Sequence, residues 1–232
     1  MVDDLARQVD ALGPWITRFT VLGREFGGSY DSTTDERVAR LPVFVPRARR
    51  ILECGCLEGG HTALLGRIYP RAEIVALDVR EANLARARLL TSAAGIRPPQ
   101  FLCRDLETAE LGELGRFDLV VCLGLLYHLR EPWQFLARVG ALTDVLWIWT
   151  QVCAEADVTA HGGKFRGRVY VEGPTDHSLS AVRTESFFPT VGSLCDMLRA
   201  AGFEDLHLLN FEATPNGPSV MVHATKERFR TL

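Results

Sequence analysis

Residues 50–61, RILECGCLEGGH, constrain the fold more than any other part of the chain. An apolar run ends in the acid Glu53, glycines follow at positions 55, 59 and 60, and a helical pattern resumes at Thr62. A buried strand that runs into a glycine turn and then a helix is the unit with which α/β sheets bind nucleotide-like ligands. The glycines let the backbone approach the ligand, and the start of the helix offers free N–H donors.

The spacing of the glycines narrows the choice of ligand. A dinucleotide fingerprint requires G-x-G-x-x-G, but Leu57 stands where the middle glycine belongs. A phosphate-binding loop ends in Gly-Lys-Ser/Thr, and the segment Gly60-His61-Thr62 has no lysine. The remaining pattern, E-x-G-x-x-x-G, places an acid beside the turn, which suits a cationic ligand head such as an amino group or a sulfonium. The alternative is a strand–turn–helix unit that only packs.

Two further buried strand patterns end in acids. Residues 74–78 end in Asp78, and residues 101–106 contain Asp105 near their end. An acid at the tip of the second strand of such a unit accepts hydrogen bonds from ribose hydroxyls, whereas an isolated acid there could also cap a helix. Charged acceptors make stronger hydrogen bonds than neutral ones.

Strand and helix patterns alternate along the rest of the chain. Strands are predicted at 50–54, 117–123, 145–150, 203–210 and 219–224, and helices at 3–12, 61–69, 81–94, 132–141 and 191–201. This alternation predicts an α/β fold: a Rossmann-like, doubly wound, seven-stranded and mostly parallel sheet with its last strand antiparallel. The last two strands are expected to form a hairpin that turns at 215–218.

We expect one domain over residues 1–232, with four parts. These are an N-terminal cap (1–49), a ligand-binding half (50–150), a lid or substrate insertion (151–188), and a C-terminal helix and hairpin (189–232). The insertion is inferred because so long an interruption of the alternation inside a compact domain is usually functional.

Composition excludes several classes of protein. The net charge of −3 gives no electrostatic footprint for nucleic acid, and the chain has no apolar run long enough to span a membrane. The first residues lack the pattern of a signal peptide. The six scattered cysteines are typical of buried thiols in a reducing cytoplasm, so we expect a cytoplasmic protein. Cys54-x-Cys56 has no second ligand pair, and no metal is expected.

The E-x-G-x-x-x-G turn resembles the first motif of the class I S-adenosylmethionine (SAM)-dependent methyltransferases. GLLYHL at 124–129, followed by Pro132, and FFPT at 187–190 resemble one subgroup of that family. The subgroup contains the tRNA wobble-uridine carboxymethyltransferases and several O-methyltransferases of sugars and natural products. The resemblance extends from about residue 26 to the end. It implies SAM as the cofactor and S-adenosyl-L-homocysteine (SAH) as its product.

The resemblance also implies which residues contact the cofactor. The turn would line its methionine end, Asp78 its ribose, and Asp105 with Leu106 its adenine. The full set of implied contacts is Glu53, Gly55, Cys56, Gly59, Asp78, Val79, Asp105, Leu106 and Leu123.

Methyl transfer to a hydroxyl needs a proton acceptor, and His is the side chain best suited to that role near neutral pH. His128, just after the fourth strand, is the best-placed candidate for the base, although a purely structural role is the alternative. His61 is expected to pack or cap beside the cofactor. The predicted substrate residues are Tyr30, Tyr127, Tyr170 and Glu172. Glu172 could join a metal site with Asp176 or His177, but the spacing of these residues does not identify one.

These patterns predict SAM-dependent methyl transfer to a small-molecule acceptor, a hydroxyl of a sugar or natural product. The alternatives are a tRNA-modifying transferase, which only the basic residues Lys164, Arg166 and Arg168 favour, and a SAM-binding protein without catalysis. N- or C-methylation of a small molecule also stays open. A nucleic acid or a membrane is not an expected partner, and the sequence leaves open whether the chain forms a homo-oligomer.

Overall fold

The computed structural model describes residues 2–174, 178–214 and 217–226, and its chain divides into two compact units, residues 1–105 and 106–232. The first unit contains these elements: α1 (Val2–Ala11), β1 (Arg18–Val21), β2 (Arg24–Gly27), η1 (Ser32–Thr34), α2 (Glu36–Ala39), α3 (Leu41–Phe44), β3 (Arg50–Cys54), α4 (Gly60–Ile68), β4 (Glu73–Asp78), α5 (Glu81–Ala93) and β5 (Gln100–Cys103).

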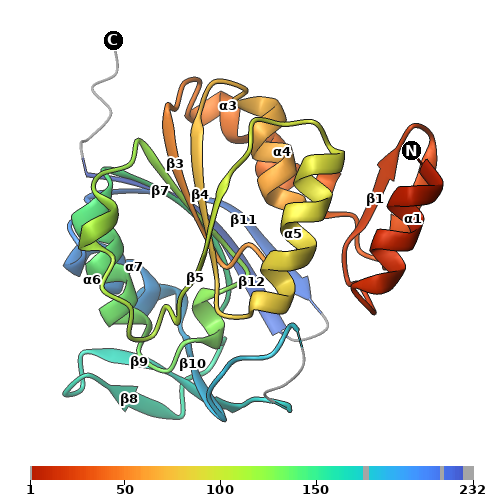
Figure 1. Cartoon of the computed structure of the whole chain (residues 1–232). Coiled ribbons are helices and arrows are strands. Elements are labelled where there is room, and N and C mark those ends of the chain that lie inside the picture. Colours follow the sequence, from red (N-terminus) through yellow and green to blue (C-terminus); the bar gives the residue numbers. More distant parts are fainter. Residues whose placement is uncertain (1, 175–177, 215–216, 227–232) are drawn as a thin grey trace. The chain divides into compact units, whose positions relative to one another are not determined.

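The second unit follows the same alternation and then departs from it. Its elements are η2 (Gly112–Leu114), β6 (Leu119–Leu123), η3 (Leu126–His128), α6 (Pro132–Leu142), β7 (Val145–Gln151), β8 (Val158–Ala160), β9 (Phe165–Val171), β10 (Glu185–Pro189), α7 (Val191–Ala200), β11 (Asp205–Thr214) and β12 (Gly217–Thr225). Figure 1 shows α6 beside α7, and β8, β9 and β10 together as a separate small sheet.

Seven strands form the main sheet in the order β11-β12-β7-β6-β3-β4-β5. The pairs β3–β4, β4–β5 and β6–β7 are parallel, whereas β12 runs antiparallel to β7 and to β11. This confirms the predicted Rossmann-like, mostly parallel sheet with its last strand antiparallel. β6 is buried along its whole length, which explains why its sequence is a continuous apolar run rather than an alternating one.

The N-terminal segment is more ordered than its sequence suggested. After α1, the strands β1 and β2 form an antiparallel hairpin that no residue pattern predicted. Trp15 joins the two parts, because its indole N–H donates to the Val9 carbonyl at 3.0 Å and its ring packs against Phe19. The same apolar cluster reaches Ala63 on α4 and Leu90 on α5, so burial of apolar surface holds this segment to the unit.

The predicted insertion also has regular structure. β8, β9 and β10 form a three-stranded antiparallel sheet. Trp133 of α6 packs against Phe165 and Phe187 of this sheet, with ring centroids 5.8 and 5.6 Å away. The predicted turn at 215–218 falls partly on residues 215–216, which lie outside the described residues.

The cysteines only partly follow the expectation of buried thiols. All six are free; Cys103 is exposed and Cys195 is half-buried, whereas the other four are buried. Cys103 is the last residue of β5, an edge strand of the sheet that is only partly covered, and this explains its exposure. Among the described residues, no helix is both long enough and apolar enough to cross a membrane.

A buried histidine lies in the antiparallel part of the sheet. His223 of β12 is 1% exposed and stands opposite His207 of β11, with ring centroids 5.9 Å apart. Burial and, to a smaller extent, the neighbouring His207 lower the pKa of His223 to about 4, although Asp205 acts in the opposite direction. The unfolded chain therefore binds a proton in a pH range where the folded chain does not.

We predict that His223 makes the protein less stable as pH falls from about 6.5 towards 4. The stability that depends on neutral His223 is complete above the unfolded pKa of about 6.5. It declines towards the folded pKa, by roughly 3 kcal/mol. Chemical denaturation from pH 4 to 7 should show a shallower decline for His223→Gln than for the wild type. Equal slopes in the two proteins would contradict the assignment.

Candidate functional site

The glycine turn between β3 and α4 requires glycine at two positions. Gly55 and Gly59 have φ of +79° and +80°, in the left-handed region that other residues rarely adopt. A Cβ at Gly59 would also lie 2.9 Å from the Ala87 Cα on α5, so the turn packs closely on that helix. Leu57, where a dinucleotide-binding turn has its second glycine, itself has φ of +48°.

Asp78, at the end of β4, connects three segments. Its Oδ2 accepts from the Leu57 N–H at 2.9 Å, and its Oδ1 accepts from the Arg80 N–H at 2.9 Å and the Asn83 amide at 3.0 Å. Burial raises the pKa of Asp78, although these hydrogen bonds oppose the shift. Each carboxylate oxygen can accept more than one hydrogen bond, so Asp78 shapes the turn and can still accept from a ligand hydroxyl.

Glu53, the predicted acid beside the turn, is almost completely buried. The Thr62 hydroxyl, at the start of α4, donates to Glu53 Oε2 at 2.5 Å. Burial and the nearby charge of Asp78 together raise the pKa of Glu53 to about 8, against the opposing hydrogen bond. Glu53 is therefore protonated at neutral pH in the ligand-free chain, and a cation beside it would favour its ionised form.

Backbone hydrogen bonds bring the other predicted residues of this unit to the same edge of the sheet. The N–H groups of Gly55 and Cys56 both donate to the Leu77 carbonyl at 2.9 Å, and the Arg104 N–H donates to the Asp78 carbonyl at 2.9 Å. The Cys56 side chain packs into an apolar cluster. Val79 and Asp105 are half-buried beside the ends of β4 and β5.

Glu58 is a residue of the turn that the sequence analysis did not single out. It is completely buried, and its Oε2 accepts from the backbone N–H groups of Ile16 at 2.9 Å and Thr17 at 2.6 Å. Arg86 of α5 lies 3.7 Å from its other oxygen. Burial raises the pKa of Glu58 despite these contacts. Glu58 thus anchors the N-terminal segment to the turn.

A second polar cluster surrounds Asp35, also unpredicted. Asp35 accepts from the Tyr30 hydroxyl at 2.7 Å, contacts His61 Nε2 at 3.0 Å, and pairs with the Arg37 guanidinium. Burial opposes ionisation, but His61 and Arg37 hold the pKa of Asp35 well below its usual range. His61 therefore lies at the start of α4 as expected, held by Asp35. Tyr30, predicted as a substrate residue, belongs to this charged cluster and is 40% exposed.

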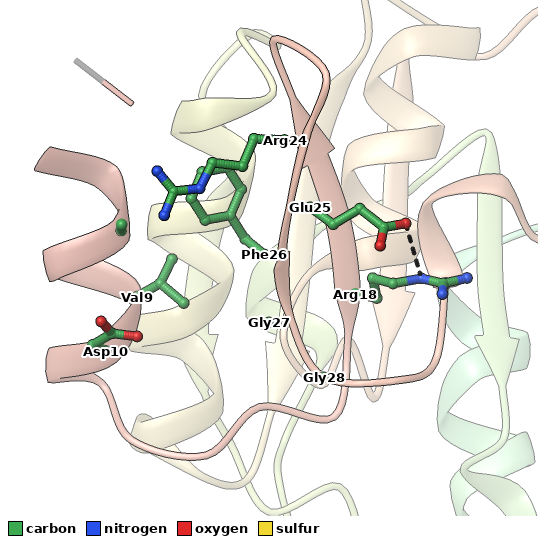
Figure 2. A pocket seen from close by; sticks show the side chains of 9 residues that line it. Val9, Asp10, Arg18, Arg24, Glu25, Phe26, Gly27 and Gly28 are labelled. Carbon is green, nitrogen blue, oxygen red and sulfur yellow. Dashed lines mark ion pairs between the residues drawn. The ribbon is translucent and has the colours of Figure 1, made fainter. Parts of the chain in front are cut away.

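A groove of about 310 Å³ lies between α1 and the β1–β2 hairpin. Figure 2 shows Arg24 and Phe26 projecting towards α1, which carries Val9 and Asp10, whereas Arg18 and Glu25 project from the other side of the hairpin. Arg18 pairs with Glu25 at 3.8 Å, and Arg24 pairs with Asp3 at 3.1 Å. None of the predicted site residues lines this groove, and we assign no function to it.

In the second unit, two predicted residues meet. Nδ1 of His128, in η3, lies 3.0 Å from Oε1 of Glu172, just after β9. Their side chains are 20% and 4% exposed. Burial raises the pKa of Glu172, but the hydrogen bond and charge of His128 together with hydrogen bonds from Ser186 and Ala181 outweigh it, so that the pKa lies below the ordinary value. An ionised Glu172 accepts from Nδ1–H and thereby leaves the Nε2 lone pair of His128 free.

Aromatic rings surround this His–Glu pair. The Tyr127 ring lies 4.3 Å from that of His128 and makes edge contacts with Trp149 at 6.0 Å and Phe188 at 5.6 Å. Tyr170 stacks on Phe188 at 4.9 Å. Tyr127, Tyr170 and Glu172, predicted as substrate residues, are thus gathered around the predicted base.

Leu106 and Leu123, two predicted cofactor contacts, are both buried in this unit. Asp176 and His177, considered with Glu172 as metal ligands, lie outside the described residues. Within residues 2–174, 178–214 and 217–226, no three His, Cys, Asp or Glu side chains are grouped so that they could hold a metal ion.

Comparison with known proteins relates the chain to methyltransferases and supports SAM as its cofactor. Residues 51–144 match the family described as "Methyltransferase domain". A malonyl-[acyl-carrier protein] O-methyltransferase of Anoxybacillus flavithermus is 36% identical over 39% of this chain and 33% of that protein. A tRNA U34 carboxymethyltransferase of Shewanella frigidimarina is 27% identical over 92% of this chain and 62% of that protein. The chain thus spans less than two thirds of these relatives.

One solved structure matches nearly the whole chain. The N-terminal domain of EvdMO1, crystallised in the presence of SAH and D-fucose, is 29% identical with a TM-score of 0.87, and the match covers 98% of this chain and 97% of that domain. The match covers 47% of the full EvdMO1 chain. The chain is similar to the class I SAM-dependent methyltransferases in its matched domain, residues 51–144, and in its fold over nearly its whole length. Within that class it is similar both to a tRNA U34 carboxymethyltransferase and to the EvdMO1 domain, which confirms the predicted subgroup.

We predict that Glu53 makes the ligand-free protein less stable as pH rises from about 4.5 to 8. In that range the folded chain holds a proton that the unfolded chain has lost, so the free energy of unfolding falls by about 5 kcal/mol in total. Glu53→Gln, which keeps the acceptor for Thr62, should remove this decline in denaturant titrations. Glu73→Gln, an exposed carboxylate on β4, serves as the control. Parallel curves for Glu53→Gln and the wild type would contradict the assignment.

Proposed function

We propose that the chain transfers a methyl group from SAM to a hydroxyl of a sugar or sugar-containing natural product, with His128 as the general base. The residues of the turn fit the cofactor: two left-handed glycines open the backbone, and the buried acids Glu53 and Asp78 suit an amino group and ribose hydroxyls. Bound SAM supplies a sulfonium methyl group and leaves as neutral SAH.

The observation that carries the catalytic part is the 3.0 Å contact between His128 Nδ1 and Glu172 Oε1. A carboxylate that accepts from Nδ1–H fixes the tautomer and orientation of the ring and stabilises the imidazolium. His128 Nε2 then takes the proton of the acceptor hydroxyl as the hydroxyl oxygen forms its bond to the methyl carbon and the carbon–sulfur bond breaks. Aligning the acceptor and excluding water are the remaining tasks of the protein.

A sugar acceptor is favoured by the similarity to the EvdMO1 domain crystallised with D-fucose and by the aromatic residues around the His–Glu pair. A second candidate is tRNA modification, favoured by the Shewanella frigidimarina relative and by the exposed basic residues Lys164, Arg166 and Arg168. Arg168 lies 3.7 Å from Asp157, which offsets part of this charge. Affinity for tRNA that falls steeply with salt would favour the second candidate.

We predict that Asp78→Ala weakens SAM binding by at least about 100-fold, because it removes charged hydrogen bonds to the ribose and leaves the Leu57 N–H of the turn without its acceptor. Isothermal titration with SAM measures this directly. Asp196→Ala, which removes an exposed carboxylate on α7, should bind like the wild type. Equal SAM affinity in Asp78→Ala and the control would exclude the role of Asp78.

We predict that His128→Ala lowers kcat by about 10²–10⁴ while SAM binding persists. The assay follows methyl transfer from labelled SAM to fractionated metabolites or a panel of sugars. Glu172→Gln should lower kcat less and shift the pH–rate profile, because the carboxylate no longer stabilises the imidazolium.

His207→Gln, on an exposed histidine of β11, is the matched control and should retain wild-type turnover. Near-normal turnover of His128→Ala would refute the base. SAM binding without transfer to any acceptor by the wild type would instead favour a non-catalytic SAM-binding protein.

A further inference from the structure

Tyr170 is an exposed aromatic residue at the outer end of a continuous chain of rings. The chain runs from His128 to Tyr127 at 4.3 Å, from Tyr127 to Phe188 at 5.6 Å, and from Phe188 to Tyr170 at 4.9 Å. Phe188 is buried, whereas Tyr170 is 43% exposed. Tyr170 is therefore held in place from beneath while part of its ring remains open to solvent.

The strand register places Tyr170 on the same face as the predicted catalytic pair. Tyr170 stands opposite Ser186 and Arg168 stands opposite Phe188. Glu172 continues the ladder, because its N–H donates to the Thr184 carbonyl at 2.9 Å. Alternate residues of a strand share one face, so Arg168, Tyr170 and Glu172 project together, and Val169 and Val171 project from the other face.

The chemistry of this face matches a carbohydrate better than an apolar ligand. A pyranose has a face of C–H groups that packs on an aromatic ring, and its hydroxyls need charged or polar hydrogen-bonding groups beside that ring. Here Tyr170 supplies the ring, Arg168 supplies donors, and Asp157, 3.7 Å from Arg168, supplies an acceptor. Glu172 is only two residues from Tyr170, and it holds His128.

We infer that Tyr170 is the stacking platform of the acceptor subsite, on which the apolar face of a pyranose ring lies while one of its hydroxyls is presented to His128. The inference rests on the proposed function and assigns it a substrate class and a specificity-determining residue. Tyr170 acts by contact with the sugar and takes no part in proton transfer, so binding and turnover can be separated.

The test measures binding of D-fucose to the full chain with SAH by saturation-transfer NMR titration, without any methyl transfer. Tyr170→Ala should weaken binding by roughly 10-fold or more, whereas Tyr170→Phe, which keeps the ring, should stay within about 2-fold of the wild type. Val171→Ala, on the opposite face of β9 and 73% exposed, should bind normally.

His128→Ala distinguishes this inference from the proposed reaction. If both are right, His128→Ala binds D-fucose normally and loses transfer, and Tyr170→Ala with sugar acceptors shows a raised KM and little change in kcat. If the wild type binds D-fucose through Tyr170 but transfers no methyl group to it, the proposed reaction is refuted and the inference about Tyr170 stands.

The inference would be overturned if the wild type fails to bind D-fucose or if Tyr170→Ala binds it as tightly as the wild type. It would also be overturned if Tyr170→Ala instead abolishes binding of a single-stranded oligonucleotide, because the ring would then stack on a base.

Discussion

The turn between β3 and α4 and the ends of the neighbouring strands are held in place by the hydrogen bonds of one buried carboxylate. Asp78 accepts from the turn after β3, from the segment after β4 and from α5, through the donors of Leu57, Arg80 and Asn83. A buried N–H without an acceptor costs as much as a lost hydrogen bond, so the turn cannot move away from β4 without that cost. The Arg104 N–H, after β5, bonds to the Asp78 carbonyl, and the ends of three parallel strands are thus fixed together.

Three acids lie at this edge, and the protein accommodates each in a different way. Asp78 is surrounded by hydrogen-bond donors, Glu58 holds two backbone N–H groups and has Arg86 nearby, and Glu53 has one hydroxyl donor and a pKa raised to about 8. Burying an ionised carboxylate is costly unless it is paired. Glu53 is therefore the acid whose ionised form is least compensated, and it is the one whose ionised form a cationic ligand would stabilise most.

The sequence predicted the features that depend on neighbouring residues. β3 begins and ends at the predicted residues, and the acids at 78 and 105 lie where parallel strands end. The hairpin β1–β2 was missed because its two strands are four residues each and show no clear alternation. Contacts distant along the chain were missed for a different reason: Glu58 bonds to residues 41 and 42 positions earlier, and no local pattern marks them. Similarly, His128 and Glu172 were both chosen as candidates, but their pairing over 44 positions came only from the fold.

The difference between local and long-range contacts also distinguishes the proposed cofactor site from the proposed acceptor site. The proposed cofactor turn lies within residues 50–61, and the acids proposed to assist it lie at two neighbouring strand ends. The acceptor side joins His128, which follows a strand of the main sheet, to Glu172 and Tyr170, which belong to the inserted β8–β10 segment. Because Glu172 and Tyr170 are two residues apart on one strand face, any rearrangement of β9 that changes the acceptor surface also moves the partner of the base. If the proposed roles of these residues are right, a change in β9 that alters acceptor choice also alters proton abstraction, because Tyr170 and Glu172 move together.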